Sequence, residues 1–158
     1  MSKHVAVLMG GWSVERDVSM DSGKACATAL RKCGHQVTEI SLNRDLKQLL
    51  EALKPRPDVV FNALHGRYGE DGTIQGLFEI ANVPYIGSGV FSSAACMNKI
   101  ITKSLLQGKG IATAKFQVIQ KAISPSKGKD IIEDLGLPLI VKPATLGSSI
   151  GVNKINKF

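Results

Sequence analysis

Residues 63–76 read Ala-Leu-His-Gly-Arg-Tyr-Gly-Glu-Asp-Gly-Thr-Ile-Gln-Gly, and this stretch decides the fold. It follows the short apolar run 59–61, which is typical of a buried strand. It leads into four apolar residues at helical spacing, Ile74, Leu77, Phe78 and Ala81. The stretch therefore joins a strand to a helix, the place where open α/β sheets bind ligands. Its four glycines and its polar residues, including His65, Glu70 and Asp71, predict a binding or catalytic loop.

The chain up to Gly89 alternates strand and helix patterns around this loop. Apolar runs predict strands at 5–9, 59–61 and 84–86, and a weak alternation of apolar and polar residues predicts another at 36–40. The first helix is expected to bury a stripe and to stop at Gly34; the stripe consists of Cys26, Ala29, Leu30 and Cys33. The second helix presents four leucines, Leu46, Leu49, Leu50 and Leu53. The order βαβαβαβ predicts a doubly wound, Rossmann-like parallel sheet flanked by helices.

The turn at 10–19 opens the first helix but is not a dinucleotide site, because Gly-x-Gly-x-x-Gly is absent. Glu15 falls in the first helical turn. A carboxylate there is favoured by the helix dipole alone, so its position does not by itself indicate function.

A second unit is expected to begin between Gly89 and Lys99, giving domains 1–95 and 96–158. Its predicted elements are a helix at 100–107, a strand at 116–119, a loop at 124–129, a helix at 131–135 and a strand at 139–141. These elements form only an incomplete α+β subdomain. Lys142 and the Gly/Ser turn 147–151 suit a phosphate, although a β-hairpin with an exposed lysine explains them too.

Composition narrows the functional class. The 158 residues are 44% hydrophobic and contain no apolar run long enough for a membrane span. No secretory signal is evident, so a cytoplasmic protein is expected.

The cysteines are not spaced for a disulfide within one helix. Cys26 and Cys33 lie roughly 10 Å apart on one predicted helix, which is too far for a disulfide. With Cys96 the odd one, buried thiols are expected. The net charge of +7 comes from scattered lysines, so solvated surface charge is favoured over nucleic-acid binding.

Four motifs in this order resemble the D-alanine–D-alanine ligases of the ATP-grasp superfamily, and together they span essentially the whole chain. They are Gly-Gly-x-Ser-x-Glu-Arg-x-Val-Ser at 10–19, His-Gly-x-x-Gly-Glu-Asp-Gly-x-x-Gln-Gly at 65–76, Pro-Tyr-x-Gly-Ser-Gly at 84–89, and Val-Lys-Pro at 141–143 with Gly-Ser-Ser-x-Gly at 147–151. The resemblance implies a Rossmann-like domain followed by the start of an ATP-grasp subdomain. It also implies that ATP converts D-alanine to an acyl phosphate, which a second D-alanine attacks to give the dipeptide of peptidoglycan.

The resemblance also implies roles for residues. Glu15 matches the carboxylate that holds the first D-alanine's ammonium, through a hydrogen-bonded group that includes Ser148. His65 matches the histidine beside that substrate's carboxylate. Five residues match the ATP-binding set, namely Lys99, Lys142, Gly147, Ser148 and Ser149.

The chain departs from the family in length. The residues that hold two Mg²⁺ (or Mn²⁺) ions in a complete ligase have no match here, so no metal ligand is expected in this chain and the fragment is expected to be inactive alone. A homodimer is implied, with no nucleic-acid or membrane partner. Two alternatives stay open: a non-catalytic dimerisation or ligand-binding module, and a related ligase that makes D-alanyl-D-lactate.

Overall fold

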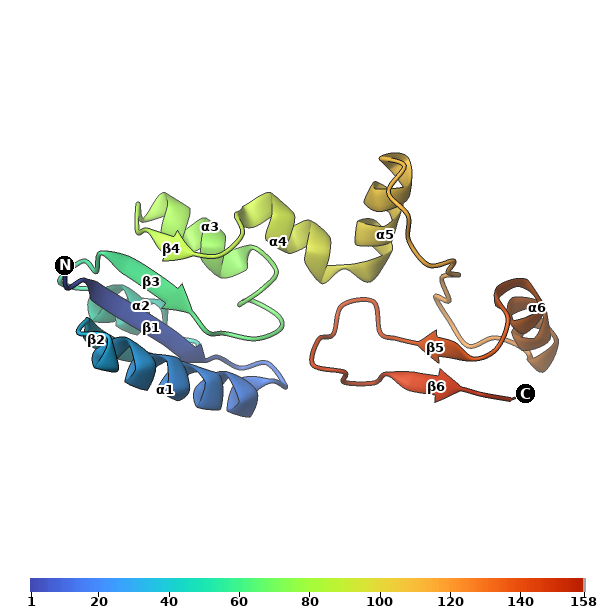
Figure 1. The fold of residues 1–158 in the computed structure, drawn as a ribbon, viewed down its shortest axis with the longest axis horizontal. Helices are drawn as coiled ribbons and strands as arrows, with labels where there is room; N and C mark the ends of the chain where they lie inside the picture. Colours follow the sequence, from blue (N-terminus) through green and yellow to red (C-terminus); the bar gives the residue numbers. More distant parts are fainter. Residues whose placement is uncertain (158) are drawn as a thin grey trace. The chain divides into compact units, whose positions relative to one another are not determined.

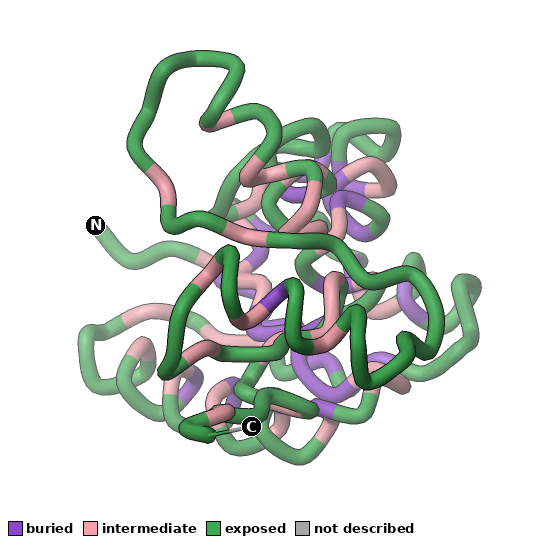
Figure 2. The backbone as a smooth tube through the Cα atoms, turned by 90° about the vertical axis from the view of Figure 1, so that its right-hand side faces the viewer, coloured by how far each residue is buried: buried purple, intermediate pink, exposed green. Residues whose placement is uncertain are grey.

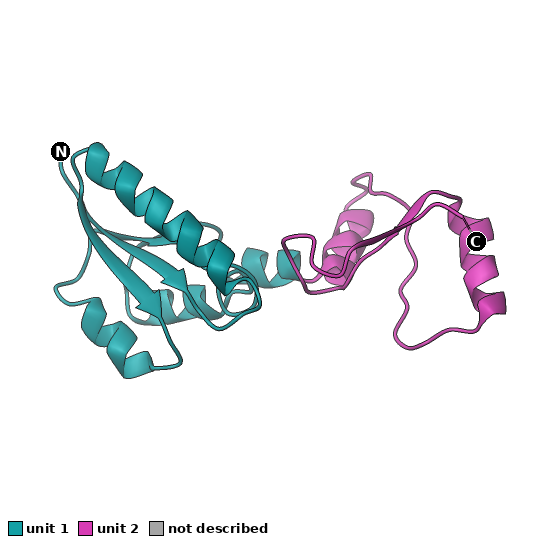
Figure 3. Cartoon of the chain, turned by 90° about the horizontal axis from the view of Figure 1, so that it is seen from below, with its two compact units in different colours: residues 1–97 teal, residues 98–158 magenta. Residues whose placement is uncertain are grey.

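The computed structural model describes residues 1–157; Phe158, the last residue of the expected second domain, lies outside the described residues. The chain divides into two compact units, Met1–Met97 and Asn98–Phe158 (Figure 3). Each unit is described by itself below.

The first unit is built on a four-stranded sheet in the order β2-β1-β3-β4 (Figure 1). The strands are β1 (His4–Gly10), β2 (Gln36–Leu42), β3 (Val59–Asn62) and β4 (Tyr85–Ile86). Each neighbouring pair runs parallel. The predicted βαβαβαβ order and the parallel Rossmann-like sheet are therefore confirmed.

The continuous apolar run of β1 serves both faces of the sheet, because successive side chains of a strand point to opposite sides. Ala6 and Leu8 join one buried cluster with residues of α2 (Leu46–Ala52) and α3 (Thr73–Ile80). Val5, Val7 and Met9 join a second cluster on the side of α1 (Arg16–Lys32). The helices thus cover the sheet on both faces, which leaves the loops at the carboxyl ends of the strands for a site.

The buried stripe of α1 differs from the predicted one. It consists of Ser19, Gly23 and Ala27, spaced four residues apart. Ala29 and Cys33 are exposed, and Cys26 and Leu30 are only half-buried. A β-carbon at residue 23 would lie 2.5 Å from Cβ of Met9, so α1 packs close to β1 through its smallest side chains.

The predicted burial of the three thiols is wrong for the same reason. Small residues occupy the contact line of α1, which leaves Cys26 at its margin and Cys33 at the exposed end of the helix. Cys96 is also exposed, on α4 (Val90–Met97). That helix was not predicted, because residues 90–97 were assigned to the boundary between domains.

The second unit contains α5 (Lys99–Gly108), α6 (Pro125–Leu135) and an antiparallel strand pair, β5 (Leu139–Val141) with β6 (Asn153–Ile155). The predictions of helix 100–107 and strand 139–141 are confirmed. Among the described residues of this unit, Ile131 is the one buried apolar residue. The other described residues of the unit are exposed or half-buried (Figure 2).

Two predictions in this unit are wrong. Residues 116–119 form no strand: the described part of the unit pairs only β5 with β6, and Phe116 instead lies 5.0 Å from the Lys103 ammonium. Residues 124–129 are not a loop, because Ser124 caps α6 and accepts a hydrogen bond from the Lys127 N–H at 3.3 Å. Proline at the first helical position fits that start.

Within residues 1–157, no helix has both the length and the apolar character that crossing a bilayer requires.

Candidate functional site

Two loops of the first unit are tied together at the carboxyl end of the sheet. The Ser19 hydroxyl donates to the Ala63 carbonyl at 2.7 Å and accepts from the Gly10 N–H at 2.9 Å, fully buried. Nearer the loop tips, the Ser13 hydroxyl donates to the His65 carbonyl at 2.8 Å. The β1–α1 loop and the β3–α3 loop therefore form one framework.

Glu15 lies inside this framework, only 2% exposed although it is charged. It is the N-cap residue of α1, yet its side chain makes no capping hydrogen bond. Its carboxylate packs against Gly66, where an added β-carbon would collide with Oε2. The helix dipole favours an exposed first-turn carboxylate as well as a buried one, so the dipole alone does not explain the burial of Glu15 against Gly66.

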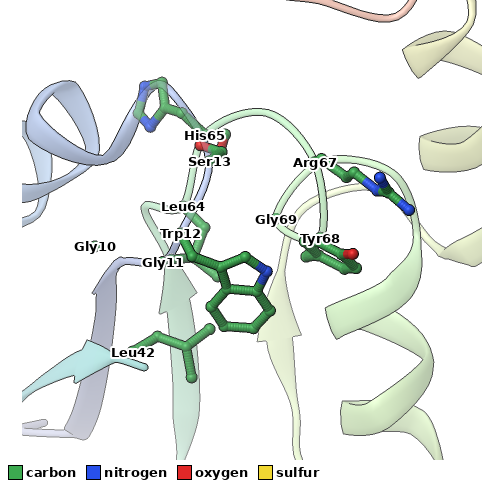
Figure 4. Close-up of a pocket in the computed structure, with 10 residues that line it drawn as sticks. All are labelled: Gly10, Gly11, Trp12, Ser13, Leu42, Leu64, His65, Arg67, Tyr68 and Gly69. Atoms are coloured by element: carbon green, nitrogen blue, oxygen red, sulfur yellow. The ribbon is translucent and has the colours of Figure 1, made fainter. Parts of the chain in front are cut away.

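His65 is half-buried, and its Nδ1 lies 2.9 Å from the Ala63 carbonyl oxygen. Because a carbonyl only accepts, Nδ1 carries the proton, and Nε2 is the ring atom left to meet a ligand. In Figure 4 the ring points away from Trp12 and Tyr68.

Acidic side chains shape the β3–α3 loop. Glu70 accepts from the Gly66 N–H at 2.7 Å, and Asp71 accepts from the N–H groups of Tyr68 and Thr73 at 2.9 and 3.1 Å. Partial burial raises the pKa of Asp71, but these hydrogen bonds outweigh it and hold the pKa below its ordinary value. The carboxylates therefore set the path of the loop that presents His65.

A small pocket of about 10 Å³, room for about one water molecule, lies between the two loops and the end of β2 (Figure 4). Trp12 and Tyr68 line it and contact each other, with ring centroids 5.0 Å apart. Arg44 and Arg67 stack on these two rings, at 5.6 and 4.8 Å. This aromatic pair was not predicted, because its two residues lie 56 positions apart and give no local signal in the sequence.

In the second unit, Lys99 contacts the segment that precedes the glycine-rich turn. Its ammonium donates to the Leu146 carbonyl at 2.6 Å, and its backbone N–H donates to the Ala144 carbonyl at 2.9 Å. Lys99, which begins α5, is thus held beside the β5–β6 connection.

The turn itself has an unusual backbone. Ser148 and Ser149 have φ angles of +46° and +60°, a region that non-glycine residues seldom adopt. Gly147 and Ser149 accept from the N–H groups of Ile150 and Val152. Lys142 lies exposed just after β5, which agrees with a hairpin and leaves its ammonium accessible to an anion.

The structure thus gathers the predicted residues into two groups. Glu15 and His65 come together in the first unit. In the second unit, Lys99 lies beside the 144–146 segment, and the same hairpin carries Lys142 and residues 147–149.

The net positive charge is confined to the second unit. Residues 98–158 contain ten lysines and three acidic residues, whereas residues 1–97 contain equal numbers of basic and acidic residues. The whole net charge of +7 therefore belongs to the second unit. No group of three or more His, Cys, Asp or Glu side chains that could hold a metal ion occurs among residues 1–157.

Comparison with known proteins identifies the family. The family described as "D-ala D-ala ligase N-terminus" matches residues 47–88, and "D-ala D-ala ligase C-terminus" matches residues 105–158. The chain is 50% identical over 155 residues to D-alanine--D-alanine ligase from Syntrophotalea carbinolica, covering 98% of this chain and 48% of that protein. The chain belongs to the D-alanine–D-alanine ligase family.

Solved structures of this family have the same fold. The ligase from Bacillus anthracis superposes with a TM-score of 0.79 at 37% identity, covering 99% of this chain and 50% of that one. The same enzyme complexed with ATP superposes with a TM-score of 0.76 at 34% identity, covering 99% and 51%. The family resemblance and the α/β fold class are thereby confirmed. The chain spans about half the length of the ligases that it matches.

Proposed function

We propose that this chain contributes the first-substrate site and part of the ATP site of a D-alanine–D-alanine ligase. The reaction would transfer the γ-phosphate of ATP to the carboxylate of one D-alanine, and the amine of a second D-alanine would displace phosphate to give the dipeptide for peptidoglycan. The observation that carries the proposal is the burial of Glu15 against Gly66, in the framework that presents His65.

D-Alanine is a small zwitterion, so its site needs an anion for the ammonium and a donor for the carboxylate. Glu15 supplies the anion. His65, with its Nδ1–H held by the Ala63 carbonyl, donates to the carboxylate from Nε2 in the imidazolium form, in which both ring nitrogens carry a proton. Fixed groups of this kind orient the substrate for attack without a covalent step by the protein.

The ATP phosphates would lie on the second unit. An ammonium has three donors, so Lys99 can keep the Leu146 carbonyl and still bind a phosphate oxygen. Lys142 adds a second positive charge, and Gly147, Ser148 and Ser149 add backbone and hydroxyl donors. The net charge of +7 on residues 98–158 supports an anionic ligand there.

Mg²⁺ (or Mn²⁺) does not fit the residues present. The acidic residues of the second unit lie on α6, and Asp134 is engaged by Lys115 and Gln117, both at 2.7 Å. In this proposal the metal ligands lie outside the chain.

We also propose that the protein is a homodimer and is cytoplasmic. The homodimer is supported by exposed apolar side chains on three neighbouring elements, namely Ile80 on α3, Ile86 on β4 and Phe91 on α4.

The test is a D-alanine titration of the ¹⁵N-labelled chain, with its intact mass verified and L-alanine as the control. We expect saturable shifts around residues 13–15 and 65–66 with D-alanine and weaker ones with L-alanine. Absent or equal responses would contradict the substrate assignment. Phosphate release from ATP, D-alanine and Mg²⁺ is measured on the same sample; we expect none, and release at the 158-residue mass would refute the placement of the metal ligands elsewhere.

A further inference from the structure

One hydroxyl group is bonded to both residues of the proposed D-alanine site. The Ser13 hydroxyl donates to the His65 carbonyl at 2.8 Å and accepts from the Glu15 N–H at 3.1 Å. A serine hydroxyl has one proton and two lone pairs, so both bonds exist at once. Figure 4 shows Ser13 directly beside His65 at the upper end of the two loops.

The hydroxyls of Ser13 and Ser19 both form hydrogen bonds that connect the β1–α1 side to the β3–α3 loop, but they do so at different depths. Ser19 is fully buried and joins Gly10 to Ala63 at the base of the loops. Ser13 is half-buried and joins residues 15 and 65 near the tips. Loss of the Ser19 hydroxyl leaves the buried Gly10 N–H without its acceptor and removes one of the two donors to the Ala63 carbonyl. Loss of the Ser13 hydroxyl instead releases the site residues from each other.

The hydrogen bonds of Ser13 matter because the chain leaves β1 through two glycines, Gly10 and Gly11, and a glycine restricts the backbone less than any other residue does. Both glycines have positive φ angles, of +86° and +78°. The bond to the His65 carbonyl fixes the peptide from which the imidazole projects, and the bond to Glu15 fixes the first turn of α1. Binding of a small zwitterion by two separate groups tolerates little error in their spacing.

We propose that Ser13 is a positioning residue that sets the spacing of Glu15 and His65 for the ammonium and carboxylate of D-alanine. The assignment rests on the function proposed above. Ser13 acts through two backbone contacts, so its hydroxyl is required and its exact side chain is not.

The experiment compares Ser13→Ala, Ser13→Thr and Ser19→Ala in the full 158-residue chain. Ser13→Ala should raise the D-alanine Kd roughly tenfold, the equivalent of one lost hydrogen bond, with a thermal midpoint close to wild type. Ser13→Thr keeps the hydroxyl and should restore the Kd to within about threefold. Ser19→Ala should lower the thermal midpoint more than either variant at residue 13.

A wild-type Kd in Ser13→Ala would overturn the proposal, and so would a Ser13→Thr variant as weak as Ser13→Ala. The ¹⁵N shifts of the His65 ring and the exchange rate of the Glu15 amide provide a readout without ligand. If the wild-type chain binds no D-alanine, the proposed function fails, and these ligand-free signals decide on Ser13. If Ser13→Ala changes both the His65 ring shifts and the Glu15 exchange rate, and Ser13→Thr returns both to wild-type values, the positioning role is supported. Wild-type values of both signals in Ser13→Ala would refute that role.

Discussion

The Glu15 carboxylate occupies the space that a β-carbon at Gly66 would fill, so the two residues are matched in size. Gly66 also has a φ angle of +70°, which L side chains rarely adopt. Gly66→Ala should therefore displace Glu15 and lower the free energy of unfolding by about 1–3 kcal/mol. D-Alanine binding should be lost at concentrations that saturate the wild type, as measured by NMR titration.

Gly34→Ala is the matched control for this change. Gly34 has a φ angle of +83°, but a β-carbon there meets no atom within 4 Å. This variant should show backbone strain of about 1 kcal/mol with unchanged D-alanine affinity. Equal affinities in the two variants would mean that Gly66 serves the turn alone.

Glu15→Gln tests whether the buried carboxylate recognises the substrate ammonium or serves only the helix dipole. We expect the D-alanine Kd to rise by at least about tenfold, because a charged hydrogen bond to the ammonium becomes a neutral one. Asp17→Asn is the control, since Asp17 is exposed in the same helical turn and has the same relation to the dipole. If both variants bind as the wild type does, Glu15 has only the electrostatic role of a first-turn acid.

The order of elements in the first unit was predictable because its signals are local. Apolar runs, helical spacing and glycine stops each lie within a few residues of the element that they mark. The buried stripe of α1 was not predictable in this way. Ser19 and Gly23 are not apolar, and they are buried because small side chains allow the helix to approach Met9.

Non-local pairing explains the other failures. Residues 116–119 have strand-like composition, yet a strand exists only where another strand pairs with it. The hydrogen bond between Ser13 and His65 joins residues 52 positions apart. The sequence motifs indicated that both residues belong to a site, but they could not predict the contact between them. The start of α6 was different: Ser124 followed by Pro125 is a local helix signal that was misread as a loop.

Acid should weaken the first unit through Asp71. Its folded-state pKa lies below the ordinary value of 3.8, although partial burial opposes the shift. Ionised Asp71 therefore stabilises the fold above pH 3.8, and this contribution is lost as the pH falls through the folded-state pKa. Asp71→Asn should lose about 1–2 kcal/mol near neutral pH, because two backbone N–H groups lose a charged acceptor.

Urea unfolding between about pH 6 and pH 3 measures this difference. The gap between wild type and Asp71→Asn should narrow toward pH 3. Asp21→Asn, on the exposed face of α1, should leave stability nearly unchanged. A gap that stays constant with pH would show that the loss does not come from the charge of Asp71.

Phe91→Asp should dissociate the proposed homodimer. Phe91 is 78% exposed on α4, and burial of such a ring against a partner is the main gain that an apolar interface offers. Light scattering over a range of concentrations should give a dimer for the wild type and for Leu46→Asp, which changes an exposed residue of α2. A monomeric wild type would contradict the dimer, and a dimeric Phe91→Asp would place the interface elsewhere.

Lys142→Ala tests the proposed phosphate contact in the second unit. Lys142 is exposed, and exposed ion pairs contribute little, so the ATP Kd should rise about two- to fivefold. Lys154→Ala removes the same charge from β6 of the same hairpin and serves as the control. Calorimetry at two salt concentrations separates a direct contact from the general positive field of residues 98–158. A direct contact weakens binding only in Lys142→Ala, whereas equal effects in both variants would assign the attraction to net charge and remove Lys142 from the ATP site.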